Sequence, residues 1–179
     1  MESTIAAILT IRPAGRGDAM RLAEIWNTEA VTTLNTTDTE ARDAAAQRAW
    51  LASHVPMYPV LVAVADDNVA GYAALKRYRE GKPAFDRTVE DSVYVHTAWR
   101  GRGVGRLLLA HLVDTARALG HHSVLARITA ENVMSRRLHE ALGFRLVGVE
   151  EAVAFKLGRW LDVAVYQRRL TLARRSDAP

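Results

Sequence analysis

Cysteine is absent from the 179 residues of the chain. Its absence excludes disulfide bonds, thiolate metal sites and a cysteine nucleophile. No apolar run reaches the roughly 18 residues that a membrane-spanning helix needs. The start, MESTIAAILTIRP, also lacks the basic residues and long apolar block of a secretory signal. We therefore expect a cytoplasmic protein without a membrane partner.

Aromatic residues are few, at 7%, and the net charge is only +4. The excess arginine is scattered in pairs, whereas a nucleic-acid-binding module more often has a strong basic face or stacking aromatics. We therefore predict no nucleic-acid partner. No H-E-x-x-H motif or cluster of metal ligands appears either, so we predict no metal site. The length fits a single domain over residues 1–179, with a core of about 11–170 and loose ends at both termini.

Apolar periodicity divides the chain into alternating strands and helices. Asp18 and Asn132 are expected N-caps, and Gly120 is expected to end a helix. Strands are predicted at 10–14, 88–96 and 122–129, a hairpin at 58–75, an antiparallel pair at 144–156 and 162–170, and helices at 18–31, 41–54, 104–119 and 132–142. This order predicts an α/β fold with a mixed central sheet flanked by helices.

One loop, in VYVHTAWRGRGVGRLLLAHL, stands between a strand and a strong helix. It is not a P-loop, because no Lys-Ser or Lys-Thr follows the glycines. A dinucleotide fingerprint is weak, because Arg106 takes the place of the third glycine and no acidic residue stands about 20 residues later. The loop does match R-x-x-G-x-G through Arg100, Gly103 and Gly105. Glycines and a helix N-terminus can present amides to a diphosphate, although a plain turn with solvated arginines is the structural alternative.

Together with Asn132 and the later string RLHEALGF, this loop makes the chain resemble the GNAT superfamily of N-acetyltransferases over roughly Ile11 to Leu170. The resemblance implies a GNAT fold with a strand–glycine loop–helix site for acetyl-CoA as co-substrate. The cofactor-binding residues it implies are Val93, Tyr94, Val95, Arg100, Gly101, Arg102, Gly103, Val104, Gly105, Arg106, Asn132 and Ser135.

Further strings, TVEDSVYVH and AFKLGRWLDVAVYQRRL among them, resemble the phosphinothricin and methionine sulfoximine acetyltransferase branch. Thr36 and Lys82 depart from its pattern, which has an aromatic residue and an arginine there, and lysine lacks the planar fork of arginine. The branch implies a small amine substrate and a homodimer with the C-terminal string near the contact. The expected substrate-binding residues are Asn35, Thr36, Lys76, Lys82, Phe85, Phe155 and Lys156.

Acetyl transfer needs a base for the amine, an oxyanion donor and an acid for the thiolate. Without cysteine, direct attack in a ternary complex is the expected scheme. The resemblance assigns the base to Glu90, with Asp91 beside it as a competitor, and the acid to His139, where many members have tyrosine. An ordered water remains a third candidate base. Another small amine, a polyamine or a protein N-terminus remains an alternative acceptor, and a non-catalytic acyl-CoA sensor an alternative function.

Overall fold

A computed structural model describes residues 9–170 of the chain. Residues 1–8 and 171–179, which make up most of the two ends expected to be loose, lie outside this range. The strands are β1 (Thr10–Pro13), β2 (Val60–Ala65), β3 (Asn68–Arg77), β4 (Thr88–Val95), β5 (Ser123–Thr129), β6 (Arg145–Lys156) and β7 (Arg159–Arg169). The helices are α1 (Ala19–Thr32), α2 (Ala44–Ser53), α3 (Val104–Ala118) and α4 (Val133–Ala141), with short 3-10 turns at Arg16–Asp18, Pro83–Phe85 and Thr97–Trp99.

The strands form one mixed sheet in the order β1-β2-β3-β4-β5-β7-β6. Every neighbouring pair is antiparallel except β4 and β5, which are parallel. The connection between these two parallel strands contains α3, as a crossover requires. The predicted α/β class and mixed sheet are confirmed.

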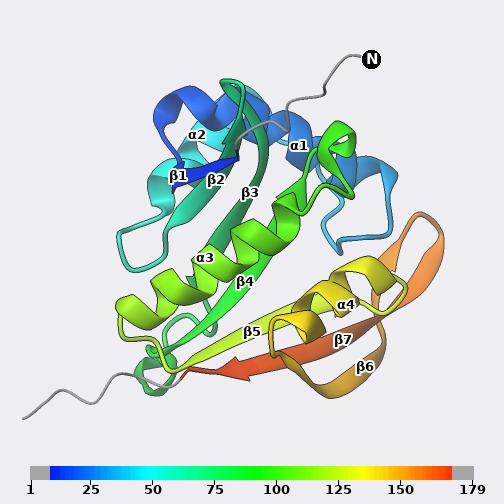
Figure 1. The fold of residues 1–179 in the computed structure, drawn as a ribbon. Helices are drawn as coiled ribbons and strands as arrows, with labels where there is room; N and C mark the ends of the chain where they lie inside the picture. The colour runs from blue at the N-terminus through cyan, green and yellow to red at the C-terminus, as the bar shows by residue number, and fades with distance from the viewer. Residues whose placement is uncertain (1–8, 171–179) are drawn as a thin grey trace, which may run out of the picture.

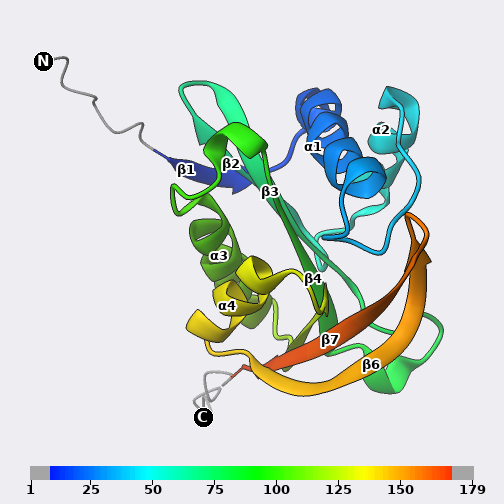
Figure 2. The ribbon, with the colours of Figure 1, turned by 90° about the vertical axis from the view of Figure 1, so that its right-hand side faces the viewer.

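Helices cover both faces of the sheet, as Figure 2 shows: α1 and α2 lie on one side, and α3 and α4 on the other. The strands in the middle are therefore apolar on both faces. In β2, Leu61 and Ala63 belong to the core beneath α3, whereas Val60 and Val62 belong to the core beneath α1. This two-sided burial explains the nearly continuous apolar run at 60–65.

Helix α3 packs a leucine-rich stripe onto the sheet (Figure 1). Leu108, Leu109 and Leu112 are fully buried there, at the spacing of one helical face. Gly120 follows the helix with a φ of +83°, which closes it as predicted. Because the stripe holds the loop that precedes α3, a Leu→Ala change in it costs about 2–5 kcal/mol and also disturbs that loop.

The expected helix caps are borne out at Asn132 but not at Asp18. Asn132 accepts a hydrogen bond from the amide of Ser135 at 3.1 Å. Asp18 precedes α1 but does not cap it, because its carboxylate binds the Arg12 guanidinium at 2.7 and 2.8 Å and the Gly15 amide at 2.7 Å. A charged partner outcompetes the neutral amides of the helix end for this carboxylate.

Candidate functional site

Strands β4 and β5 pair only at their beginnings. The register joins residues 88–90 to residues 123–125 and goes no further, although both strands continue. The edge of β4 that faces β5 is therefore unpaired over residues 91–95. Free backbone groups on such an edge can bind an extended ligand as an added strand.

Two cavities open along this unpaired edge. One, of about 440 Å³, lies at the glycine loop, and the other, of about 500 Å³, lies between the strands. They share the lining residues Asn35, Val93, Tyr94, Asn132 and Ser135. The two spaces are thus neighbours along β4, which suits a long ligand in one and a second reactant in the other.

The glycine loop depends on backbone conformations that side chains disfavour. Gly101 and Gly103 have φ values of +73° and +80°. A Cβ on Gly105, by contrast, would lie 3.3 Å from Leu138 Cδ2, so a side chain there would require Leu138 to move by a few tenths of an ångström. The first amides of α3 follow directly and have no partner within the helix. The loop and helix end together present donors and a positive dipole end to the first cavity.

Nearly all the predicted cofactor residues line the cavity at the loop, and Arg102 is the exception. Its guanidinium lies over the Trp99 ring, 5.2 Å from the centroid, and it does not line the cavity. Arg100 and Arg106 do line it. The sequence did not point to four other lining residues, which are Glu29, Trp99, Met134 and Leu138.

His139 and Asp91 form a buried pair beside the second cavity. Their side chains are 3% and 2% exposed, and His139 Nε2 lies 3.2 Å from Asp91 Oδ1. The other ring nitrogen, Nδ1, lies 2.7 Å from the carbonyl oxygen of Ser135. Burial by itself lowers the pKa of His139, but the charge of Asp91 and its hydrogen bond outweigh burial, so the pKa is raised. Asp91 Oδ2 has no hydrogen-bond partner among residues 9–170.

Glu90 lines the same cavity, and its carboxylate lies 2.8 Å from Lys76 Nζ. The Glu90 side chain is only 12% exposed. Because successive side chains of a strand alternate, Glu90 and Asp91 project from opposite faces of β4. Both residues nevertheless line the cavity beside the unpaired edge.

Of the predicted acceptor residues, Asn35, Thr36 and Lys76 line the second cavity. The other four do not line it: Lys82, Phe85, Phe155 and Lys156. Lys82 and Phe85 lie on the exposed segment between β3 and β4, and Phe155 lies on the outer strand β6 with its ring 5.3 Å from that of Trp160. Lys156 is buried, and its ammonium donates to the carbonyl oxygens of Glu29 and Thr36.

Arg127 is a cation of this cavity that the sequence analysis missed. It lines the space from β5, and its guanidinium is paired with Glu150 of β6. A signal was available, because an arginine within the apolar strand VLARIT calls for an explanation. Asp38 and Thr129 also line the cavity, and Thr129 Oγ1 is buried with no hydrogen-bond partner in the described part of the chain.

Over the same described range, no group of three or more His, Cys, Asp or Glu side chains is arranged to hold a metal ion. No helix between residues 9 and 170 is both long and apolar enough to cross a membrane.

The chain is similar in sequence and in structure to known acetyltransferases. A model of the acetyltransferase (GNAT) family matches residues 20–144. An L-methionine sulfoximine/L-methionine sulfone acetyltransferase of Salmonella typhimurium is 40% identical, over 90% of this chain and 95% of its own length. A phosphinothricin N-acetyltransferase of Streptomyces coelicolor is 39% identical, over 92% and 98%. A solved structure of a putative acetyltransferase from Salmonella typhimurium with its cofactor acetyl-CoA superimposes with a TM-score of 0.89 at 37% identity, over 97% of this chain and 100% of that one.

Proposed function

The chain belongs to the acetyltransferase (GNAT) family and is an acetyl-CoA-dependent N-acetyltransferase, and we propose that its acceptor is the α-amino group of a small amino acid such as methionine sulfoximine or phosphinothricin. The proposal rests on the unpaired edge of β4. One cavity lies along this edge at the glycine loop, and the other lies along it between β4 and β5. The relatives named above act on amino acids of this size, and the second cavity has the charges to receive one.

The residues at the loop fit acetyl-CoA. The α3 amides and Arg106 would hold its diphosphate, and Gly101 and Gly103 keep this part of the loop free of side chains. Residues 93–95 would pair with the extended pantetheine arm, and one of their amides would donate to the oxyanion. Asn132 and Ser135 line both cavities and would flank the arm where it passes from one to the other.

Acetyl-CoA supplies a thioester whose carbonyl carbon is attacked by the acceptor nitrogen, so that a C–N bond forms and the C–S bond breaks. The nitrogen starts as an ammonium and loses two protons, while sulfur gains one, so one proton is released. The chain has no cysteine to carry the acetyl group, which supports direct transfer with both substrates bound.

Residues that border the second cavity can remove a proton from the ammonium and supply one to the thiolate. Glu90 is the proposed base for the ammonium, because its carboxylate lines the cavity and is held by Lys76. His139 is the proposed acid for the thiolate, because Asp91 raises its pKa and so favours the protonated ring. Asp91 lines the same cavity and stays in contact with the ring, so the proposed acid is the His139–Asp91 pair rather than a lone imidazole.

Two cations of the second cavity are candidates for the acceptor carboxylate. Lys76 is paired with Glu90, and Arg127 is paired with Glu150. Arg127 is the better candidate, because its two terminal nitrogens already bind the carboxylate of Glu150 in parallel, a contact that the acceptor carboxylate would replace, and Glu150 plays no part in the chemistry. Thr36 and Asp38 also line this cavity and would contact the amino-acid side chain.

We further propose a cytoplasmic homodimer. Strand β6 is at the edge of the sheet, and large apolar side chains are exposed on it, on the adjoining turn and at the start of β7. They are Leu146, Val147, Val149, Val153, Phe155, Leu157 and Trp160. An edge strand of this length and composition is normally covered.

The test is thiol release from acetyl-CoA across a panel of amines: methionine sulfoximine, methionine sulfone, phosphinothricin, common amino acids, a polyamine and a short peptide. Saturable turnover confined to amino acids supports the proposal. Turnover on the peptide or polyamine alone overturns the acceptor assignment. Binding of acetyl-CoA with no turnover on any amine favours an acyl-CoA sensor instead.

A further inference from the structure

Glu29 is a buried acid on the apolar face of α1. It follows Ile25 and Trp26 by four and three residues, so it lies on the helix face that packs against the sheet. The residue is only 5% exposed. A carboxylate at such a position is costly unless charged and hydrogen-bonding partners compensate for the lost water.

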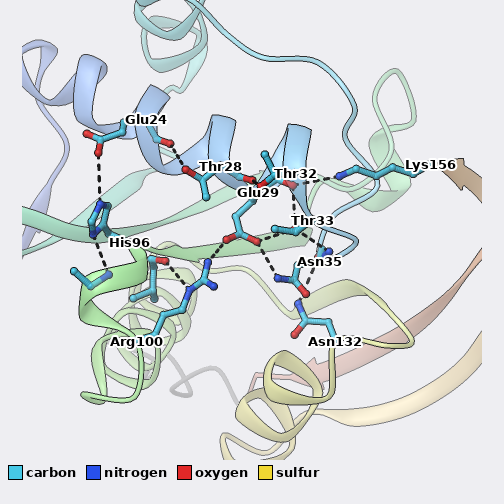
Figure 3. A network of polar contacts seen from close by, with 12 residues as sticks. Glu24, Thr28, Glu29, Thr32, Thr33, Asn35, His96, Arg100, Asn132 and Lys156 are labelled. Atoms are coloured by element: carbon cyan, nitrogen blue, oxygen red, sulfur yellow. Dashed lines mark hydrogen bonds and ion pairs between the residues drawn. The ribbon is translucent and has the colours of Figure 1, made fainter. Parts of the chain in front are cut away.

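The partners of Glu29 come from two separate loops, and its two oxygens are divided between them (Figure 3). Oε1 accepts from the guanidinium of Arg100 in the glycine loop. Oε2 accepts from Thr33 Oγ1 at 3.1 Å and from Asn35 Nδ2 at 3.0 Å, both in the segment after α1. One carboxylate thus connects the cofactor loop to the residues that line the acceptor cavity.

Two more side chains hydrogen-bond to the segment that follows α1. Lys156 Nζ donates to the carbonyl oxygens of Glu29 at 3.2 Å and Thr36 at 2.8 Å. Asn132 Nδ2 donates to the carbonyl oxygen of Asn35 at 3.4 Å. We call residues 33–38 the acceptor loop, because Asn35, Thr36, Thr37 and Asp38 of this segment line the second cavity.

Arg100 is already engaged by the protein through two of its nitrogens. Its Nε donates to the carbonyl oxygen of Val95 at 3.3 Å, and its NH2 group donates to Glu29. Arg106 lines the same cavity but has no hydrogen-bond or ion-pair partner among residues 9–170. The two arginines that line this cavity therefore differ: the side chain of Arg100 is bound to α1, and the side chain of Arg106 is available to an anion.

Building on the proposed function, we propose that Glu29 is a positioning residue for the acceptor, and that Arg100 works through Glu29 on the acceptor loop rather than as a ligand of the diphosphate. The first arginine of R-x-x-G-x-G in this chain then sets the place of Asn35 and Thr36. The α3 amides and Arg106 are left to hold the phosphates.

A double-mutant cycle of Glu29→Gln and Arg100→Gln tests this coupling, with the KM and kcat for methionine sulfoximine and the Kd for acetyl-CoA as readouts. Each single variant should raise the acceptor KM by on the order of tenfold, the effect of losing one charged hydrogen bond. The Kd for acetyl-CoA should stay within about threefold of the value for the unmodified protein. Losing one charged hydrogen bond to acetyl-CoA would raise this Kd by more than that. The double variant should be no worse than the poorer single one, because both remove the same contact.

Arg106→Gln provides the contrasting variant, since it should raise the Kd for acetyl-CoA and leave the acceptor KM nearly unchanged. Arg100→Lys keeps the charge without the fork and should restore the KM in part. The proposal is overturned if Arg100→Gln weakens acetyl-CoA binding as Arg106→Gln does, or if the effects of the two single variants add.

The coupling can still be tested if Glu29→Gln does not fold or if the protein acetylates no amine. If Glu29→Gln does not fold, Arg100→Gln alone decides, because the Arg100 side chain is 45% exposed and its removal leaves a smaller gap. If the unmodified protein acetylates no amine, the proposed function fails, but the coupling can still be measured. Amide hydrogen exchange at residues 33–38 should then rise in Arg100→Gln and not in Arg106→Gln; equal exchange in both would contradict the coupling.

Discussion

Replacing Asp91 by asparagine should reverse the sign of the contribution that His139 makes to the pH dependence of the free energy of unfolding. In the unmodified protein the pKa of His139 is raised: burial lowers it, but the charge of Asp91 and its hydrogen bond raise it by more. A raised folded-state pKa means that the folded protein binds more protons than the unfolded one. This stabilisation is fully present below the unfolded value of about 6.5 and is lost as the pH rises through the folded pKa.

The asparagine variant keeps the shape of the pair and removes its charge. Burial, the largest influence on the imidazole, then lowers the pKa of His139 against only the weaker opposing hydrogen bond to the Ser135 carbonyl oxygen. The folded-state pKa of His139 then falls below its unfolded value, and stability should rise with pH where it previously fell. Side-chain exposures of 3% and 2% mean that water and salt screen the pair little. At pH 6 we expect a loss of about 1–3 kcal/mol, the cost of leaving a buried polar group without its partner.

The assay is urea unfolding at a series of pH values from 5.5 to 8.5, chosen about the ordinary histidine pKa, together with an NMR titration of the imidazole signals. His139→Gln, which has no proton to bind, provides the control and should flatten the contribution of this site. If Asp91→Asn leaves both the pH slope and the His139 titration unchanged, the electrostatic account of the pair is wrong.

Other variants probe the remaining parts of the site. Glu90→Gln should lower kcat by about 10²–10⁴-fold, the range for a lost general base, with the Kd for acetyl-CoA unaltered; a normal kcat would remove Glu90 from the mechanism. Gly103→Ala forces a side chain into a φ of +80° and should cost about 1–2 kcal/mol in urea unfolding, whereas Gly17→Ala, with no atom within 4 Å, should cost little. Lys156→Met leaves the carbonyl oxygen of Thr36 without this donor and should cost about 1–3 kcal/mol, against a negligible loss for the exposed Lys82→Met. Trp160→Ser should shift a dimer toward monomer in sedimentation velocity, whereas Met20→Ser, equally exposed but on α1, should not.

Local patterns predicted the fold, and they pointed to most of the residues that line the cavity at the glycine loop, because both are encoded in contiguous segments. The strand at 88–96, the glycines and the leucine stripe of α3 follow one another in sequence, so their spacing fixes their relation in space. Gly103 has a φ of +80°, a conformation that a glycine in a strand–helix turn readily adopts.

The acceptor side could not be predicted in the same way, because it is assembled from distant segments. Lys156 was expected to bind the acceptor, but the β6–β7 hairpin folds toward α1 and buries it against backbone carbonyl oxygens. Lys82 and Phe85 adjoin Lys76 in sequence, but the chain turns away after β3 and carries them out of the cavity. The Glu29–Arg100 contact joins residues 71 positions apart, and neither residue alone signals the other.

Product analysis with acetyl-CoA labelled with carbon-13 in its acetyl group tests the central claim most directly. With methionine sulfoximine as acceptor, we predict N-acetyl product and free coenzyme A thiol in equal amounts, with the intact mass of the enzyme unchanged throughout. Acetate in place of the amide, or a mass increase of the enzyme by one acetyl group during turnover, would contradict direct transfer to a bound amine.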